Sequence, residues 1–273
     1  MPLHEQVPVV PGPPPRIEVR NAAGSVTVAA LEAAAQLTVR VEALDETAEQ
    51  LLDRVEIDIQ EGNAHSPARL RVAVPERRLL RTPAFAVRIN TPPDAVVRVA
   101  AASAAVVLTG NLGKLDISTA SGDVDVQRGT EVTVRTASGA ARIATVEGHG
   151  SVGSASGAIR IGRGLDLLKL RTASGDITVE HSGGATTART ASGDVTVGAA
   201  AGESVQAQTA SGDITVGVPP GRRVWLDLHS VSGRMRSDLD EEPPGAGAAP
   251  DVTLTLESVS GRIRIGHTAA AAV

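Results

Sequence analysis

The chain of 273 residues contains no cysteine and no tyrosine, and it has a single phenylalanine and a single tryptophan. The absence of cysteine excludes disulfides, a thiol nucleophile and cysteine-based metal sites. The formal charge of −5 is mild and the basic residues are dispersed. Without aromatic side chains to stack on bases and without a basic patch, the sequence lacks the features of a nucleic-acid-binding protein.

Long apolar segments are also missing. No stretch approaches the roughly 18 apolar residues of a membrane-spanning helix. Residues 1–15 (MPLHEQVPVVPGPPP) lack the basic region and the uninterrupted apolar core of a signal peptide, and we expect them to form a disordered, proline-rich lead-in. The sequence therefore predicts a soluble, cytoplasmic protein with no direct membrane span, associated with the cell envelope only through a partner.

The main feature of the sequence is one phrase repeated eight times between residues 119 and 265: a hydroxyl residue, a small residue, Ser and Gly, followed by an alternating segment such as TASGDITV. Its serines are Ser121, Ser138, Ser156, Ser174, Ser192, Ser211, Ser232 and Ser260, spaced 17, 18, 18, 18, 19, 21 and 28 residues apart. Such a sustained period is typical of a solenoid, in which each repeat is one supersecondary unit.

Four apolar columns appear when each repeat is numbered from its Ser, at positions −6, −4, +3 and +5. The positions between them are mostly polar, and alternation with period two predicts a strand with one buried face. Each repeat is then two short strands bent at the Ser-Gly corner, where Gly tolerates unusual backbone angles. We expect Val124 and Ile177 to point inward, and Arg142 and Thr178 to point outward.

The same register reveals two further units without the complete motif, one around Ser103 and one at residues 17–28. The second is centred on Ala23, with Ile17, Val19, Val26 and Val28 in the four columns. The predicted fold is therefore all-β, a parallel β-solenoid (β-helix-like) of about ten 18-residue rungs, stacked roughly 4.8 Å apart.

The periodicity also predicts the domain organisation. An irregular, β-rich N-terminal section is expected to cap the stack, because an exposed solenoid end is a row of unpaired backbone groups. An acidic, Pro/Gly-rich insertion should loop out of the stack near its C-terminal end. The predicted segments are the N-terminal section at 16–96 (strands at 37–43, 55–61, 68–75 and 84–90, short helix near 45–55), the regular solenoid at 97–267, the inserted loop at 238–251 and a frayed tail at 268–273.

Asp176, Asp194 and Asp213 follow the Ser-Gly corner in consecutive repeats and would form a column of like charges. Such a column could be a cation ladder, but Asp also commonly bonds the backbone of its own turn. The same slot holds Ala140, Ala158, Arg234 and Arg262 in the other repeats, and the G-G-x-G-x-D loops of calcium-binding rolls are missing. We therefore expect no metal site.

The repeats contain two columns of threonines, which the high strand propensity of threonine is sufficient to explain. Catalysis would need convergent groups in a groove, but the six histidines are scattered and the repeated serines have no recurring histidine partner. We predict no enzymatic activity, no catalytic residue and no cofactor. The outward threonine column is Thr178, Thr196 and Thr215, the column near the corner is Thr136, Thr172, Thr190 and Thr209, and the histidines are His4, His65, His149, His181, His229 and His267.

The segments IEVRNAAGSVTV at 17–28 and INTPPDAVVRV at 89–99, followed by the serial T-A-S-G-D-[IV]-x-V units, resemble a bacterial putative-adhesin family of β-strand-repeat proteins with a domain of unknown function. The resemblance covers nearly the whole chain. It implies a non-enzymatic solenoid, in relatives often tied to the cell envelope or its stress response.

Two hypotheses on function remain open. In the first, the chain is a scaffold or interaction module whose flanks or ends dock an unknown protein partner or a second copy, a use that suits repeat surfaces. In the second, it binds an envelope glycan or another anionic polymer through outward Arg and Thr columns. The arginines concerned are Arg142, Arg160, Arg171 and Arg189.

Overall fold

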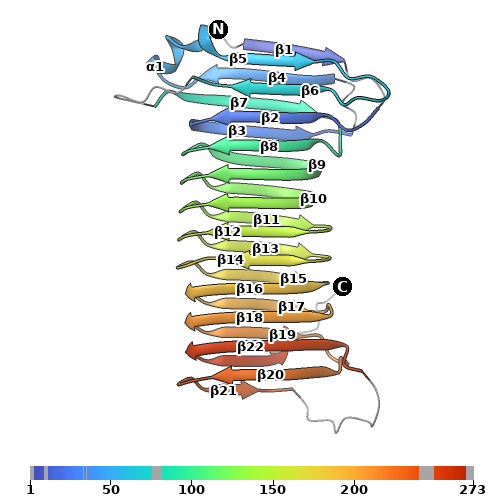
Figure 1. The fold of residues 1–273 in the computed structure, drawn as a ribbon, viewed down its shortest axis with the longest axis vertical. Coiled ribbons are helices and arrows are strands. Elements are labelled where there is room, and N and C mark those ends of the chain that lie inside the picture. Colours follow the sequence, from blue (N-terminus) through green and yellow to red (C-terminus); the bar gives the residue numbers. More distant parts are fainter. Residues whose placement is uncertain are drawn as a thin grey trace. The chain divides into compact units, whose positions relative to one another are not determined.

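The computed structural model describes residues 3–8, 12–32, 34, 36–75, 82–239 and 249–268 (Figure 1). Nearly all regular structure is β, as predicted. The chain divides into two compact units, Met1–Ile143 and Ala144–Val273. In each unit the strands form two ladders, here named ladder A and ladder B, and one rung consists of a strand from each.

Ladder A of unit 1 contains β5, β6, β2, β8 and the second halves of β9 and β10. Ladder B contains β1, β4, β7, β3 and the first halves of β9 and β10. The elements are β1 (Leu3–Pro8), β2 (Arg16–Asn21), β3 (Ala23–Ala30), β4 (Gln36–Ala43), α1 (Glu46–Glu49), a 3₁₀ turn (Leu52–Arg54), β5 (Glu56–Gln60), β6 (Arg69–Ala73), β7 (Ala84–Thr91), β8 (Val96–Ala101), β9 (Ala105–Thr119), β10 (Val124–Thr136) and β11 (Ala141–Val146), which crosses the boundary between the units.

The register predicted for the two repeats that lack the complete motif, at 17–28 and around Ser103, is confirmed. β2 pairs in parallel with β8, with Ile17 opposite Val97. β3 pairs in parallel with β9, with Val26 opposite Val106. All four side chains are buried. The repeat at 17–28 is thus a rung that stacks directly on the rung of Ser103.

The segment between these two repeats contributes one more rung and a cap. β6 and β7 pair in parallel with β2 and β3, so they form a rung that the Ser-Gly register did not identify. β5 and β4 then pair antiparallel with β6 and β7. The helix predicted near 45–55 is present as α1 and the 3₁₀ turn, and the Asp45 carboxylate caps α1 by accepting the Ala48 N–H at 2.7 Å. These two strands pair with the edge strands β7 and β6, whose backbone N–H and C=O groups would otherwise face solvent.

Part of the expected disordered lead-in is ordered. Residues 3–8 form β1, which pairs antiparallel with β4. The backbone of β4 has a free edge on the side away from β7, and β1 satisfies its N–H and C=O groups. The prediction of disorder was therefore wrong for these six residues, whereas residues 1, 2 and 9–11 lie outside the described part of the chain.

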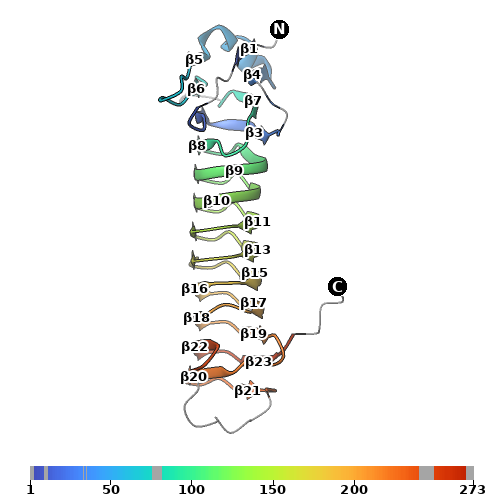
Figure 2. The same ribbon diagram turned by 90° about the vertical axis from the view of Figure 1, so that its right-hand side faces the viewer.

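Unit 2 consists of parallel ladders on opposite sides of a narrow interior (Figure 2). In spatial order, ladder A contains β12 (Gly150–Ser154), β14 (Leu168–Arg171), β16 (Ala185–Ser192), β18 (Ser204–Ser211), β22 (Val252–Ser260) and β20 (Val224–Ser230). Ladder B contains β13 (Ile159–Gly164), β15 (Ile177–Ser182), β17 (Val195–Ala200), β19 (Ile214–Val218), β23 (Ile263–His267) and β21 (Met235–Ser237).

The interior columns are those that the alternation predicted. Val124 and Ile177 are fully buried, Thr178 is half-buried and Arg142 is exposed. Within the four columns of the described repeats, a polar side chain is buried at Thr186, and its hydroxyl lies 2.7 Å from the hydroxyl of Ser182. A lapse in the apolar column is thus matched by a second buried hydroxyl that satisfies it.

The rungs at the end of unit 2 are not stacked in chain order. β22 and β23 lie between β18/β19 and β20/β21, with Ser260 opposite Ser211 and Leu254 opposite Leu226 (Figure 1). The spacings of 21 and 28 residues mark this exchange of order. The expected loop at 238–251 is described only at its two ends, because residues 240–248 lie outside the described part, as do residues 269–273 of the expected tail.

Candidate functional site

The first residue of the T-A-S-G motif stabilises the corner through hydrogen bonds of its hydroxyl group. Thr172 Oγ1 accepts the N–H of Gly175 at 3.1 Å and donates to the carbonyl of Gly157 in the adjacent rung at 3.5 Å. The same acceptor geometry recurs at Thr119, Thr136, Ser154 and Ser230. The corner column of Thr136, Thr172, Thr190 and Thr209 is buried. Its hydroxyls form hydrogen bonds within the corner, as at Thr136, to the adjacent rung, as at Thr190 and Thr209, or both, as at Thr172.

The repeated serines also connect rungs. The hydroxyl of Ser103 donates to Ala22 O at 3.3 Å, and that of Ser232 donates to Val259 O at 3.0 Å. The backbone N–H groups of the same serines donate to these carbonyls at 2.8 and 3.0 Å. The multiplicity of the serines therefore has a structural explanation in the stacking of the corners.

The corner glycines are needed for space rather than for backbone angle. Among the described glycines only Gly24, Gly110 and Gly221 have a positive φ, and of these only Gly24 lies at a corner of the predicted register. A Cβ atom on Gly175 would overlap the carbonyl oxygen of Gly157 in the adjacent rung. The same overlap arises at the corner glycines Gly122, Gly139, Gly193, Gly212 and Gly261. The predicted reason for glycine, unusual backbone angles, is thus wrong at these corners.

The aspartate column bonds the backbone between rungs. The N–H of Asp194 donates to Asp176 Oδ1 at 2.9 Å, and the N–H of Asp213 donates to Asp194 Oδ1 at 2.8 Å. Each carboxylate thus serves the next rung and not its own turn, which corrects the simpler interpretation. No group of three or more His, Asp or Glu side chains in the described residues is arranged to hold a metal ion.

Asp213 ends this column with an ion pair. It accepts the backbone N–H of Arg262 at 2.8 Å and the Arg262 Nε–H at 2.9 Å. These two hydrogen bonds, the backbone one first, lower the pKa of the Asp213 carboxyl below its usual value of 3.8. The charged form is therefore the one that stabilises the corner.

This pKa shift predicts how the Asp213→Asn variant depends on pH. Because the pKa is lower in the folded protein, the stabilisation is complete above the unfolded pKa of about 3.9 and is lost as the pH falls through the folded pKa. The variant should lose at most about 1 kcal/mol of unfolding free energy at pH 7. Urea unfolding at pH 7 and at pH 3 should show that this difference shrinks in acid. Asp125→Asn, at an exposed position of β10, is the control and should show no such trend; a difference that persists at pH 3 would contradict the assignment.

The four arginines of the polymer-binding hypothesis do not form one row. Arg142 pairs with Asp123 at 3.3 Å, and Arg189 donates to Gln208 at 2.7 Å. Arg171 lies beside Arg189 on ladder A of unit 2, whereas Arg160 lies on ladder B. Within unit 2, the structure therefore places Arg160 on a different ladder from Arg171 and Arg189.

The terminal rung of unit 2, formed by β20 and β21, was not recognised as an end from the sequence. Among the described strands, β20 pairs only with β22. The carbonyl of Arg223 accepts the N–H of Val252, and since backbone groups alternate along a strand, those of Leu226 and Leu228 face away from the stack. Trp225 is 63% exposed and Val231 is 71% exposed.

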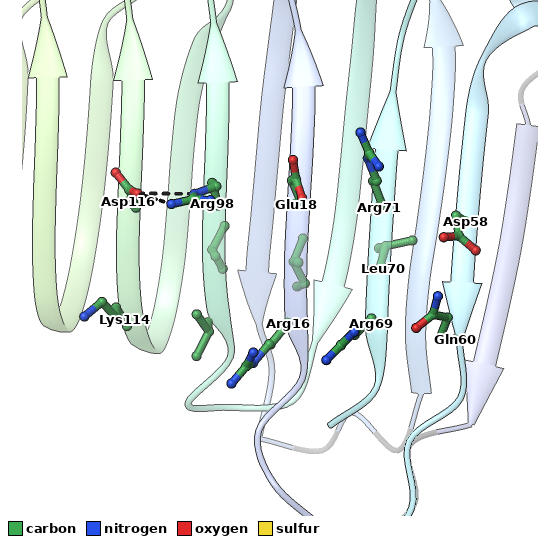
Figure 3. A pocket seen from close by; sticks show the side chains of 13 residues that line it. Arg16, Glu18, Asp58, Gln60, Arg69, Leu70, Arg71, Arg98, Lys114 and Asp116 are labelled. Carbon is green, nitrogen blue, oxygen red and sulfur yellow. Dashed lines mark hydrogen bonds and ion pairs between the residues drawn. The ribbon is translucent and has the colours of Figure 1, made fainter. Parts of the chain in front are cut away.

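Unit 1 has a groove of about 680 Å³ on the outer side of ladder A (Figure 3). It crosses β5, β6, β2, β8 and β9. Five cationic and three acidic side chains line it, a net charge of +2 in a chain whose formal charge is −5. They are Arg16, Arg69, Arg71, Arg98 and Lys114, and Glu18, Asp58 and Asp116. The sequence did not point to this groove, because it depends on the insertion of β2 between β6 and β8.

This chain is similar to several solved structures at low sequence identity. No curated protein matches it. Among solved structures, a "putative lipid binding protein" from Parabacteroides distasonis is 15% identical, with 97% of this chain and 96% of that chain covered and a TM-score of 0.49. A "putative adhesin" from Bacteroides fragilis is 13% identical, with 97% of both chains covered and a TM-score of 0.42.

No helix in the described residues is long and apolar enough to cross a membrane. The family model described as Toastrack DUF4097 matches residues 16–266, which is nearly the whole chain. The chain therefore belongs to the Toastrack DUF4097 family.

Proposed function

We propose that this chain is a non-enzymatic scaffold that associates with a second copy of itself through the terminal rung of unit 2. The observation that supports the proposal is the outer edge of β20, with which no other described strand than β22 pairs. Its outward N–H and C=O groups and its half-buried Leu226 and Leu228 would gain both hydrogen bonds and apolar burial from another strand.

The residues of β20 are self-complementary in one antiparallel register. In a two-fold dimer centred on Leu228, the outward backbone groups of Leu228 face those of the copy's Leu228. Trp225 then lies opposite the copy's Val231, which joins two exposed apolar side chains. Asp227 lies opposite the copy's His229, and the two side chains have opposite charges when the imidazole is protonated. Because the dimer has two-fold symmetry, each of these contacts occurs twice.

Sedimentation velocity over a range of protein concentrations tests the proposal. The wild-type chain should shift from monomer to dimer as its concentration rises, and Asp227→Lys should weaken the dimer about tenfold at low salt, because lysine faces His229. The double variant Asp227→Lys with His229→Glu restores opposite charges and should restore the dimer. Both positions are exposed, so folding should be unaffected.

Two outcomes would contradict the proposal. A wild-type chain that stays monomeric at every concentration would exclude self-association. An Asp227→Lys variant that dimerises as strongly as wild type would exclude the proposed register. Thr178→Lys, at an outward position in the middle of unit 2, is the control for the added charge and should dimerise normally.

A further inference from the structure

The groove on ladder A of unit 1 contains a row of side chains that comes from segments far apart in the sequence. Gln60 lies opposite Arg69, Arg69 opposite Arg16, and Arg16 opposite Val96. Lys114 follows in the next rung, since Val97 lies opposite Leu115. Neighbouring members of the row are about 4.8 Å apart along the stack.

A short side chain makes the hollow. Val96 is the one small residue in the row, and it is half-buried between two long cationic side chains, Arg16 and Lys114. Figure 3 shows Arg16, Arg69 and Lys114 extending in the same direction from their strands. This direction carries the head groups of Arg16 and Arg69 toward the space above Val96, whereas the Lys114 ammonium is directed toward Glu131 and has to turn to reach that space.

The charges around the hollow are not balanced by the protein. Arg16 and Arg69 lie directly opposite each other, and like charges in that position are destabilising. In the described part of the chain, neither side chain forms an ion pair or a hydrogen bond. Two of the three acidic groups of the groove are already engaged, because Asp116 binds Arg98 at 3.0 Å and Glu18 binds Arg20 at 3.1 Å. The third, Asp58, lies opposite Arg71 and not opposite Arg16 or Arg69. An external anion is the missing partner for Arg16 and Arg69.

We propose that this groove binds a phosphate or sulfate group above Val96, held by Arg16 and Arg69 and approached from the other side by Lys114. The planar guanidinium presents parallel N–H donors that match the oxygens of such an anion. A tetrahedral oxyanion has enough oxygens for all three cations. Lys114, which binds Glu131 at 2.7 Å, can share its three ammonium protons between that carboxylate and the ligand.

Isothermal titration calorimetry at low ionic strength tests this site with inorganic phosphate, sulfate and tripolyphosphate as probes. The wild-type chain should bind them, and Arg16→Gln with Arg69→Gln should weaken binding at least about tenfold. Tighter binding of tripolyphosphate than of phosphate would indicate a polymeric ligand, and equal binding would indicate a single group. Arg160→Gln, at an exposed position of unit 2, is the matched control and should bind as wild type does.

A second variant separates a shaped site from general attraction between charges. Val96→Glu would place a tethered carboxylate between Arg16 and Lys114, so it should abolish binding of the probes and raise the melting temperature. Asp227→Lys, designed to weaken the dimer, should still bind the probes as wild type does, which keeps this test independent of self-association. Absence of heat with all three probes, or unchanged binding in the double glutamine variant, would overturn the proposal.

Discussion

The Gly175→Ala variant is expected to lose about 3 kcal/mol or more of unfolding free energy, because the added methyl group meets the backbone of the adjacent rung. A Cβ at this position overlaps the carbonyl oxygen of Gly157. Neither backbone can move aside without breaking the hydrogen bonds between rungs, such as that from Ser174 N to Ala155 O at 3.0 Å. Urea unfolding followed by circular dichroism would measure the loss.

Gly153→Ala is the matched control for this experiment. Gly153 lies in β12 of unit 2, where a Cβ meets nothing within 4 Å and the φ is not in the left-handed region. Alanine at this position should leave stability unchanged or raise it by about 0.5 kcal/mol, because it restricts the unfolded chain. Equal losses at both positions would show that close approach is not the reason for glycine at the corners.

The order of the last rungs gives a second large effect. The chain has no cysteine, so pairs of introduced cysteines report proximity without interference. Thr215 lies opposite Arg264, and Arg264 lies opposite Arg236. Thr215→Cys with Arg264→Cys should form a disulfide under mild oxidation, since neighbouring strands bring Cα atoms within the required 4.4–6.8 Å.

The comparison pair is Thr215→Cys with Arg236→Cys, which stand two rungs apart at roughly 9.6 Å and should keep both thiols free. Mass spectrometry after thiol labelling distinguishes the two results. If the rungs were stacked in chain order, the second pair would cross-link and the first would not. All three positions are exposed, so the substitutions should not disturb the interior.

The sequence was sufficient for the interior of the stack and insufficient for its ends. Period-two alternation identified the columns, and the pairing of Ile17 with Val97 followed from them. The rung of β6 and β7 was missed because its corner lacks the Ser-Gly phrase. The exchange of the last two rungs was missed because the repeats of Ser232 and Ser260 have the same columns, so either could stack on β19.

The corner chemistry was partly predictable. Serines and aspartates were recognised as corner residues, but the burial of Thr172 was not, although its position two residues before Ser174 has the same parity as the interior columns. The groove of Arg16 and Arg69 could not be predicted from the sequence, because these residues become neighbours only through the position of β2 between β6 and β8.

The exchange of the last two rungs also limits how unit 2 can fold. β22 and β23 leave the ribosome after β20 and β21, yet they occupy the position between those strands and β18/β19. Rung-by-rung growth along the emerging chain therefore produces the final order only as far as β19. β20 and β21 lack their final partners, β22 and β23, until the later strands arrive, and their pairing across a long connection is expected to be a slow step. A nascent chain interrupted before β22 would expose both the free edge of β18 and the apolar faces of β20 and β21, which are features that chaperones and proteases act on.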